Sequence, residues 1–174
     1  EFSPLFYENK KYKVWKCLIS PSTCKPCFDL NGKLYLPEEA PPEFPKLHEN
    51  CGCTVVWSES VKKGTCTFEG KNGIDISLLN GNILPEQYLT KKDAKKLGWK
   101  PNLMNLRQVT DRGIIGGDIY RNKEGKLPAC NGRIWYEADI NYIGGMRNSS
   151  RILYSNDRLV FVTYDHYFTF NQIC

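Results

Sequence analysis

The sequence predicts an α+β protein in which short helices precede an antiparallel sheet, with a small cysteine- and histidine-rich β module in front of both. Two observations lead to this prediction. Helix-forming segments lie between residues 84 and 109, whereas strand-like alternation of apolar and polar residues fills most of residues 112–170. Six of the eight cysteines precede residue 70, which sets an N-terminal part apart from the rest.

The positive charge is distributed unevenly along the chain. Residues 84–174 carry 14 lysines and arginines against 9 acidic residues, whereas residues 1–83 carry 10 of each. The net charge of +5 therefore lies wholly in the second part. A basic surface kept for solubility is one explanation, and contact with a polyanion is the other.

The length and composition are those of a folded protein. With 174 residues, 41% of them hydrophobic and 13% aromatic, the chain suffices for one domain or two small ones. No stretch approaches the ~18 apolar residues of a membrane span, and the first residues lack the apolar core of a signal peptide. The chain does not begin with Met, as expected for a fragment of a longer protein.

The helices are expected at the start of the C-terminal part. In residues 84–99, Thr90 is a suitable N-cap, Asp93 follows three positions later, and Gly98 is a natural stop. Residues 101–109 predict one or two further helical turns, capped by Asn105.

Strands follow these helices. Residues 114–120 predict a strand that ends in a glycine-containing turn. Polar and charged residues then alternate with apolar ones across residues 133–140, as in a half-buried strand. Further strands are expected in three segments, namely residues 151–154, 159–164 and 167–170.

Residues 132–173 contain the side chains needed to cleave a phosphodiester by acid–base chemistry. Glu137 and His166 supply a base and an acid, while Arg147 and Arg151 supply fixed positive charge for the transition state. RNA carries its own nucleophile, the 2′-hydroxyl, so no cofactor is expected for catalysis, and DNA is expected to bind uncut. The alternative is that Glu137 is a cross-strand partner of an arginine on an ordinary charged surface.

The N-terminal part contains a compact set of metal-ligand residues. Cys24 and Cys27 form a Cys-x-x-Cys knuckle, and His48, Cys51 and Cys53 follow. Such knuckles hold a tetrahedral structural zinc. Two disulfides between the knuckles are the alternative for an exported protein. A redox pair is disfavoured, because Pro26 indicates a loop rather than a strand-to-helix setting.

The remaining elements of the N-terminal part are expected to be short. A strand is predicted at residues 14–20, a hairpin at 28–36 around an Asn-Gly turn, an extended proline-rich loop at 37–47, and a strand at the end of 48–57.

Three segments follow from this pass along the chain. Residues 1–65 are the Cys/His-rich module, residues 66–83 a polar linker, and residues 84–174 the catalytic domain. Asn80-Gly81 favours a turn over a long helix within the linker.

The N-terminal part resembles the C-terminal end of the Mu F-like phage minor head proteins. The likeness rests on Trp15, the Cys24-x-x-Cys27 knuckle, the run LNGK at residues 30–33, the proline-rich loop, and the final LHENCGC at residues 47–53. Gly52 stands where that family usually has arginine. The resemblance implies a delivery or docking module, as found ahead of the toxin domain in bacterial polymorphic toxins.

Residues 84–174 resemble the barnase-like, guanyl-preferring ribonucleases. The matching runs are LPEQYLTKKDAKKLGW, IGGDIY, NKEGKLP, GRIWYEADINY, RNSSRILYS and DHYFTF. The resemblance implies a barnase-like fold and metal-independent cleavage of RNA to a 2′,3′-cyclic phosphate.

The resemblance also implies a role for each matching position. Glu137 is the general base, His166 the general acid, and Tyr167 the aromatic residue beside the acid. Three cations surround the scissile phosphate, namely Lys91, Arg147 and Arg151. Asp118 and Asp139 are carboxylates that orient the basic residues.

A separate set of positions matches the guanine-binding loop. Glu124 is the carboxylate that binds the Watson–Crick edge of guanine, together with backbone groups of residues 121–123. Lys123 stands where the family has arginine, which keeps the charge but loses the planar fork. Tyr120 stands in place of phenylalanine, and Arg121 in place of a small polar residue.

The resemblance further implies an acidic, barstar-like immunity protein that protects the producing cell. Such an inhibitor is expected to present carboxylates to four cleft residues, namely Lys91, Arg147, Arg151 and His166. The chain is then a secreted or delivered bacterial toxin that acts in the target-cell cytoplasm. Two alternatives are a nucleic-acid-binding protein without turnover and a virion-associated protein.

Overall fold

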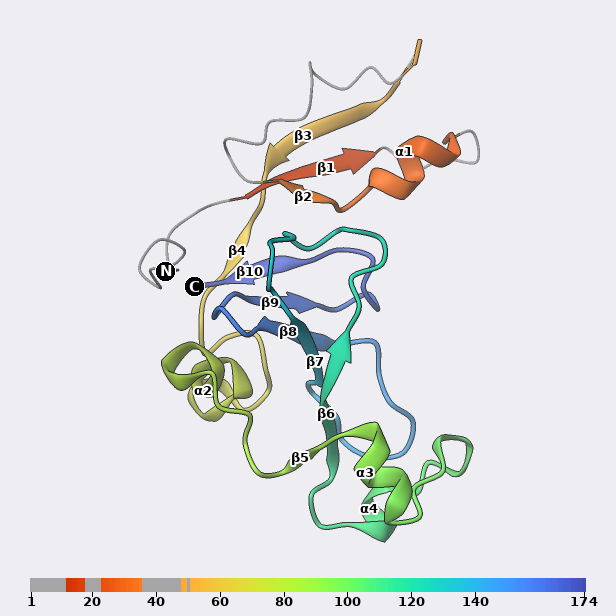
Figure 1. Cartoon of the computed structure of the whole chain (residues 1–174), viewed down its shortest axis with the longest axis vertical. Coiled ribbons are helices and arrows are strands. Elements are labelled where there is room, and N and C mark those ends of the chain that lie inside the picture. Colours follow the sequence, from red (N-terminus) through yellow and green to blue (C-terminus); the bar gives the residue numbers. More distant parts are fainter. Residues whose placement is uncertain (1–11, 18–22, 36–47, 50) are drawn as a thin grey trace.

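The computed structural model of the chain describes residues 12–17, 23–35, 48–49 and 51–174. In these residues the α+β prediction is confirmed, because two sheets combine with a few short helices. A three-stranded sheet lies at one end of the molecule and a seven-stranded sheet forms its centre (Figure 1). The proline-rich loop expected at 37–47 and the end of the strand expected at 14–20 lie outside the described residues.

The large sheet has an antiparallel centre with a parallel strand at each edge. In the described residues its order is β4-β10-β9-β8-β7-β6-β5, and only the β4–β10 and β5–β6 pairs are parallel. This agrees with the antiparallel sheet that the alternating pattern predicts. The bounds are β4 Ser60–Val61, β5 Tyr88–Leu89, β6 Ile114–Tyr120, β7 Trp135–Asp139, β8 Arg151–Ser155, β9 Val160–Thr163 and β10 Asn171–Ile173.

Helix α3 (Lys91–Lys96) forms where the sequence predicts it. Thr90 is its N-cap and accepts a hydrogen bond from the backbone N–H of Asp93. Gly98 ends the segment at φ +97°, a conformation that favours glycine. The 3₁₀ turn η3 (Pro101–Leu103) and helix α4 (Leu106–Val109) follow, although the side chain of the N-cap residue Asn105 makes no capping bond to α4.

Helix α2 (Ile74–Gly81) replaces the turn that was expected at Asn80-Gly81, so that expectation is wrong. The turn residues come after the helix, with Asn82 in the left-handed region at φ 55°. Ile74 and Leu78 lie one helical turn apart and are both buried. They pack into the main core together with Cys66, so residues of the expected linker form part of the domain core.

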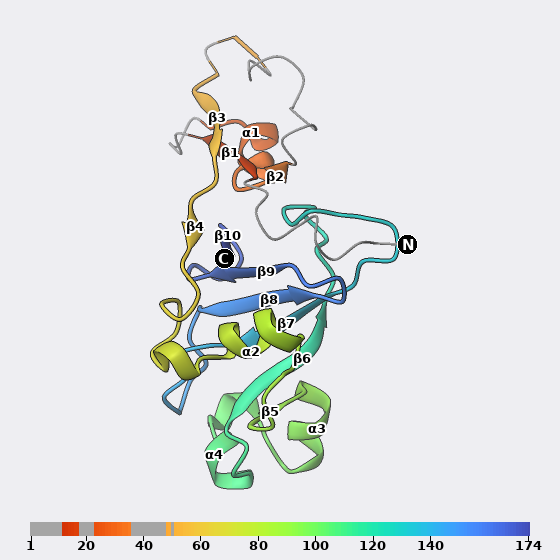
Figure 2. The same cartoon turned by 90° about the vertical axis from the view of Figure 1, so that its left-hand side faces the viewer.

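The two faces of the large sheet are used differently. Helix α2 lies across one face (Figure 2), where Ala138, Ile152 and Val162 pack against it. Side chains alternate along a strand, so Glu137 and Asp139 project to the opposite face. That face carries the charged residues considered below.

The N-terminal module consists of β1 (Lys13–Cys17), α1 (Lys25–Leu30), β2 (Leu34–Tyr35) and β3 (Cys53–Trp57). The 3₁₀ turn η2 (Gly70–Asn72) lies outside this module, between β4 and α2. The hairpin expected at residues 28–36 is wrong, because its first arm is helix α1. A proline in the first helical turn is favourable rather than disruptive. Cys24 is therefore the N-cap of a helix and Cys27 lies within it, so the assignment of this pair to a loop is also wrong.

The N-terminal module packs against the large sheet. Tyr12, Val14 and Leu34 enter a buried cluster with Trp135 and Phe161, on the face opposite α2. The backbone N–H of Leu34 also donates to the carbonyl of Lys126 at 2.9 Å. Figures 1 and 2 both show the small sheet and α1 above this end of the large sheet, with α3 and α4 at the far end.

In the described part of the chain, no helix has both the length and the apolar character needed to cross a membrane.

Candidate active site

The register of the central strands brings the predicted charged residues together. Asp139 on β7 lies opposite Arg151 on β8, and Asp118 on β6 lies opposite Glu137 on β7. A bulge interrupts β6 between Gly116 and Asp118. Bulges redirect side chains beside active sites, and here the bulge precedes the carboxylate that faces Glu137.

Glu137 is a buried carboxylate with two defined donors. Its side chain accepts hydrogen bonds from Lys91 Nζ and from the Tyr167 hydroxyl, the latter at 2.5 Å. Only 7% of the residue is exposed. A buried anion needs such partners, so the carboxylate is held at a fixed position on the sheet face.

Lys91 also offsets an unfavourable pairing of two acids. Asp118 and Glu137 are direct cross-strand neighbours, and like charges in that position repel. The backbone N–H of Lys91 donates to Asp118 Oδ2 at 2.9 Å, while its ammonium group binds Glu137. Asp118 thus fixes the start of helix α3, from which the lysine side chain reaches the other acid.

Asp139 holds both predicted phosphate-binding arginines. Its oxygens lie 2.6 Å from Arg147 Nε and Nη2 and 2.9 Å from Arg151 Nε. Burial alone would lower the pKa of Arg147, but the bonds to Asp139 outweigh it and the pKa is raised. Among the described residues Arg147 and Arg151 share the carboxylate of Asp139, so this group holds two cations and one anion, which favours binding of an additional anion.

His166 and Tyr167 lie in a tight turn rather than in a strand. The strand expected at 167–170 is therefore wrong, and the last strand is β10 at Asn171–Ile173. His166 and Tyr167 have φ values of +56° and +71°, which are uncommon for residues with side chains.

Asp165 stabilises this turn through its side chain. Its Oδ1 accepts from the backbone N–H groups of Phe168 and Thr169 at 3.1 and 2.9 Å. Its Oδ2 accepts from the Thr169 hydroxyl at 2.6 Å. These bonds, with one from Thr163, outweigh the effect of burial and lower the pKa of Asp165.

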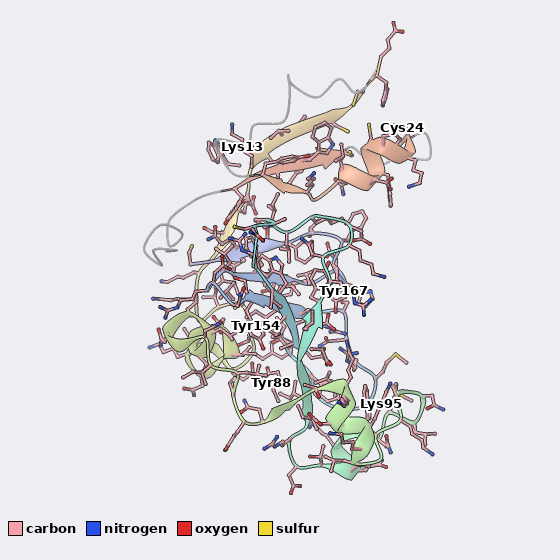
Figure 3. All side chains as sticks on the ribbon, viewed as in Figure 1. Lys13, Cys24, Tyr88, Lys95, Tyr154 and Tyr167 are labelled. Atoms are coloured by element: carbon pink, nitrogen blue, oxygen red, sulfur yellow. The ribbon has the colours of Figure 1, made fainter. Side chains whose placement is uncertain are left out.

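Tyr167 connects the predicted base and the predicted acid. Its hydroxyl donates to Glu137, and its ring centroid lies 4.8 Å from that of the exposed His166. Burial raises the pKa of Tyr167, and the bond to Glu137 raises it further. The hydroxyl therefore stays protonated at neutral pH. In Figure 3, Tyr167 lies on the same side of the molecule as Cys24 of α1.

A cavity of about 770 Å³ opens beside His166. The loop after β6 forms one wall, and its conformation depends on Asn122, whose side chain bonds the N–H and carbonyl of Leu127. The predicted substrate-binding residues all line this cavity, namely Tyr120, Arg121, Lys123, Glu124 and Tyr167. Three residues of α1, Lys25, Phe28 and Asp29, also line it, and the sequence did not predict their presence.

The predicted zinc ligands also come together, at the other face of α1. Ligand atoms of Cys24, Cys27 and His48 lie within 4.8 Å of one another, and so do those of Cys27, Cys51 and Cys53. All eight cysteines belong to the described residues, and no disulfide joins any two of them in the structure. The sulfur of Cys17, which was not predicted to take part, lies 2.7 Å from that of Cys53.

Other contributors were also missed by sequence reasoning. Asn122 and Asp165 bond backbone groups three to five residues away, and an Asx residue beside a turn is the only local sign of such a role. The contribution of α1 has no local sign, because it depends on the contact between the two modules.

A buried carboxylate, an exposed histidine and a cluster of paired cations on an α+β scaffold form a site suited to acid–base chemistry on a phosphodiester. A match to known sequences identifies the protein family. Residues 76–174 match a family described as ribonuclease, and the chain belongs to that family.

Curated relatives agree with the family match. The chain is 46% identical over 102 residues to ribonucleases of Bacillus intermedius, Bacillus pumilus and Heyndrickxia coagulans. The match covers 59% of this chain and 94% of the Heyndrickxia coagulans protein. It spans 63% of the length of each Bacillus protein.

Proposed function

We propose that the chain cleaves single-stranded RNA by intramolecular transphosphorylation. Glu137 takes the proton of the ribose 2′-hydroxyl, and the 2′-oxygen attacks the adjacent phosphorus. As the bond from phosphorus to the 5′-oxygen breaks, His166 gives that oxygen a proton. The products are a 2′,3′-cyclic phosphate and a free 5′-hydroxyl. The main support for this proposal is that Tyr167 contacts both Glu137 and His166, so the proposed base and acid lie close to one another.

The roles of base and acid agree with their surroundings. Glu137 is buried and held by two donors, which suits a base that must face one proton. His166 is exposed beside the cavity, where a leaving group is accessible. Each partner of such a pair typically contributes about 10²–10⁴-fold to the rate.

The cations stabilise the charge that develops on the phosphoryl oxygens. Asp139 orients Arg147 and Arg151 before the substrate arrives, so little reorganisation is needed during the reaction. Lys91 neutralises the carboxylate of Glu137, which otherwise repels a phosphate.

Guanine preference is the second part of the proposal. The exposed carboxylate of Glu124 accepts hydrogen bonds from the Watson–Crick edge of guanine, and backbone groups of residues 121–123 complete the contact. This rests on the place of Glu124 at the cavity wall and on the rigid loop that Asn122 maintains. Lys123 supplies charge to the same loop without a bidentate fork.

We also propose a structural zinc site in the N-terminal module. The favoured ligands are Cys24, Cys27, His48 and Cys51, because His48 Nε2 and the Cys51 sulfur lie 3.2 and 3.6 Å from the Cys27 sulfur. The other ring nitrogen of His48, Nδ1, lies 2.8 Å from the carbonyl of Glu49. That contact leaves Nε2 as the ring nitrogen that binds the metal, as is usual for a ligating histidine.

The biological setting follows from the two modules. We place the module boundary between β3 and β4, because β4 is part of the large sheet. In this proposal the N-terminal module serves delivery or docking of a secreted toxin that acts in the target-cell cytoplasm. A barstar-like acidic immunity protein covers Lys91, Arg147, Arg151 and His166 in the producing cell.

Product mapping tests the proposed reaction. A defined RNA of mixed sequence is incubated with the purified chain in EDTA, and both new ends are identified. Cyclic phosphate ends after guanosine are expected, with about 10²–10⁴-fold less product from Glu137→Gln and His166→Ala. RNA that is bound but left intact would instead indicate a nucleic-acid-binding protein. Cleavage that both variants retain would disprove the assigned roles.

A further inference from the structure

Helix α1 has two functional faces. Cys24 and Cys27 belong to the proposed zinc cluster, whereas Lys25, Phe28 and Asp29 line the cavity of the ribonuclease domain. The cavity thus has one wall from each module. Figure 3 shows the Cys24 end of α1 above the part of the domain that carries Tyr167.

The wall from α1 is held firmly in place. Gly32, just after the helix, has φ +81°, and a Cβ atom there would lie 2.6 Å from the carbonyl oxygen of Phe168. The N–H of Leu34 then bonds the carbonyl of Lys126 in the base-binding loop. These contacts tie α1 to both of the loops that form the remainder of the cavity.

The chemistry of the wall suits a nucleotide. Phe28 is 45% exposed, and its ring centroid lies 5.8 Å from that of Phe168 across the module boundary. Within the described part of the chain Lys25 pairs with Asp29, and both side chains are exposed. Such a surface pair is weak and is readily exchanged for a phosphate. Aromatic faces interspersed with cations are the usual design for binding single-stranded nucleic acid.

We propose that α1 completes a nucleotide subsite of the ribonuclease, in which Phe28 stacks on a base and Lys25 binds the neighbouring phosphate. The cavity volume of about 770 Å³ is suited to a nucleotide, since small-molecule sites span about 300–1,000 Å³. The wall that α1 contributes lies outside the segment 76–174 that matches the family. It rests on the proposed function only in assuming that RNA is the ligand.

Two substrates of different length reveal this subsite. The full chain is assayed with a GpU dinucleotide and with a six-nucleotide RNA containing one guanosine. Phe28→Ala is expected to raise the KM of the longer RNA about tenfold, the effect of losing one stacked base, while kcat changes less than twofold. Phe28→Tyr is expected to restore the wild-type KM. Phe68→Ala is the matched control, because Phe68 is 78% exposed and does not line the cavity.

A binding measurement separates this inference from the catalytic proposal. Fluorescence anisotropy with the corresponding DNA hexamer, which lacks the 2′-hydroxyl, reports affinity without cleavage. Lys25→Ala is expected to reduce the slope of log affinity against log salt by about 0.7, the value for one contact to a single strand. The inference is overturned if Phe28→Ala leaves KM and affinity within twofold, or if it improves them because α1 obstructs the cavity. If the wild type fails to cut RNA, the affinities still decide this inference.

Discussion

The Tyr167 hydroxyl donates a hydrogen bond to Glu137 Oε2 at 2.5 Å, from a turn into the middle of the sheet. One end of the tyrosine thus fixes the predicted base, and its ring lies beside the predicted acid. The relative position of the predicted base and the predicted acid therefore depends on Tyr167, which contacts both of them.

Replacing Tyr167 with phenylalanine tests this relationship. The ring beside His166 remains, but the donor to Glu137 is lost. We expect kcat to fall about 10- to 100-fold, because a hydrogen bond to a charged group contributes about 1.5–3 kcal/mol. KM for a GpU dinucleotide should change little. Steady-state kinetics provide the measurement, and an unchanged kcat would show that Lys91 alone is enough to hold the base.

Asp139 is expected to be the most sensitive charged residue of the site. It is 1% exposed, and Asp139→Asn leaves Arg147 and Arg151 without their shared anion. Breaking a buried pair costs about 3–5 kcal/mol of unfolding free energy, and the misplaced guanidinium groups should lower kcat about 100-fold.

Urea unfolding and steady-state kinetics measure both effects. Asp29→Asn is the control for stability, since its partner Lys25 is exposed and such pairs contribute about 0–1 kcal/mol. Equal destabilisation by the two variants would contradict the importance of the buried cluster.

The turn that carries His166 should respond to acid through Asp165. Burial alone would raise the pKa of Asp165, but the hydrogen bonds to its carboxylate outweigh this effect and lower the pKa below the ordinary value of 3.8. A carboxylate of this kind adds stability above its unfolded pKa and loses it as the pH falls through the folded value. We therefore expect the free energy of unfolding to decrease as the pH falls below about 4.

Asp165→Asn removes this contribution. The variant should be less stable at pH 7 and should lose less stability between pH 4 and pH 2 than the wild type. Displacement of His166 should lower kcat about 10- to 100-fold. Thermal unfolding across this pH range, with Asp111→Asn as an exposed control, provides the measurement. Identical acid profiles for the two variants would refute the role of Asp165.

The cysteine cluster should retain zinc during purification without added metal. About one zinc per chain is expected, with all eight cysteines reactive to thiol reagents after chelation and unfolding. Cys24→Ser should lose the metal, whereas Cys130→Ser, outside the cluster, should keep it. A metal-free protein with blocked thiols would show disulfides in this module instead.

Local sequence was sufficient for the elements that carry the catalytic residues. The Thr90 cap and the alternation through β7 are properties of a few neighbouring residues, and both are as predicted. Glu137 and Asp139 follow from this alternation, because period two places them on one face. The resemblance of residues 84–174 to ribonucleases supplied the predicted role of each charged residue. The family match begins at residue 76, so it also covers α2 from Ile76 onward.

Elements that depend on distant contacts were missed. Helix α2 contains Asn80-Gly81, a strong local turn signal, and its formation requires burial of Ile74 and Leu78 against strands far along the chain. Helix α1 is only six residues long, which is too short for a helix to be stable without tertiary packing. The wall that α1 contributes to the cavity and the short distance between the sulfurs of Cys17 and Cys53 depend on the same long-range packing. Sequence spacing does not encode such packing.

The edge position of β4 affects how the protein can be divided. Ser60–Val61 pairs with β10, and the N–H of Cys174 donates to the carbonyl of Val61 at 3.0 Å. A chain that lacks residues 1–65 would also lack β4 and would expose the backbone donors and acceptors of β10, and open edges recruit strands from other molecules. Strand β4 thus covers an edge of the large sheet that would otherwise be open to other molecules. A soluble fragment that contains the large sheet should therefore begin before β4.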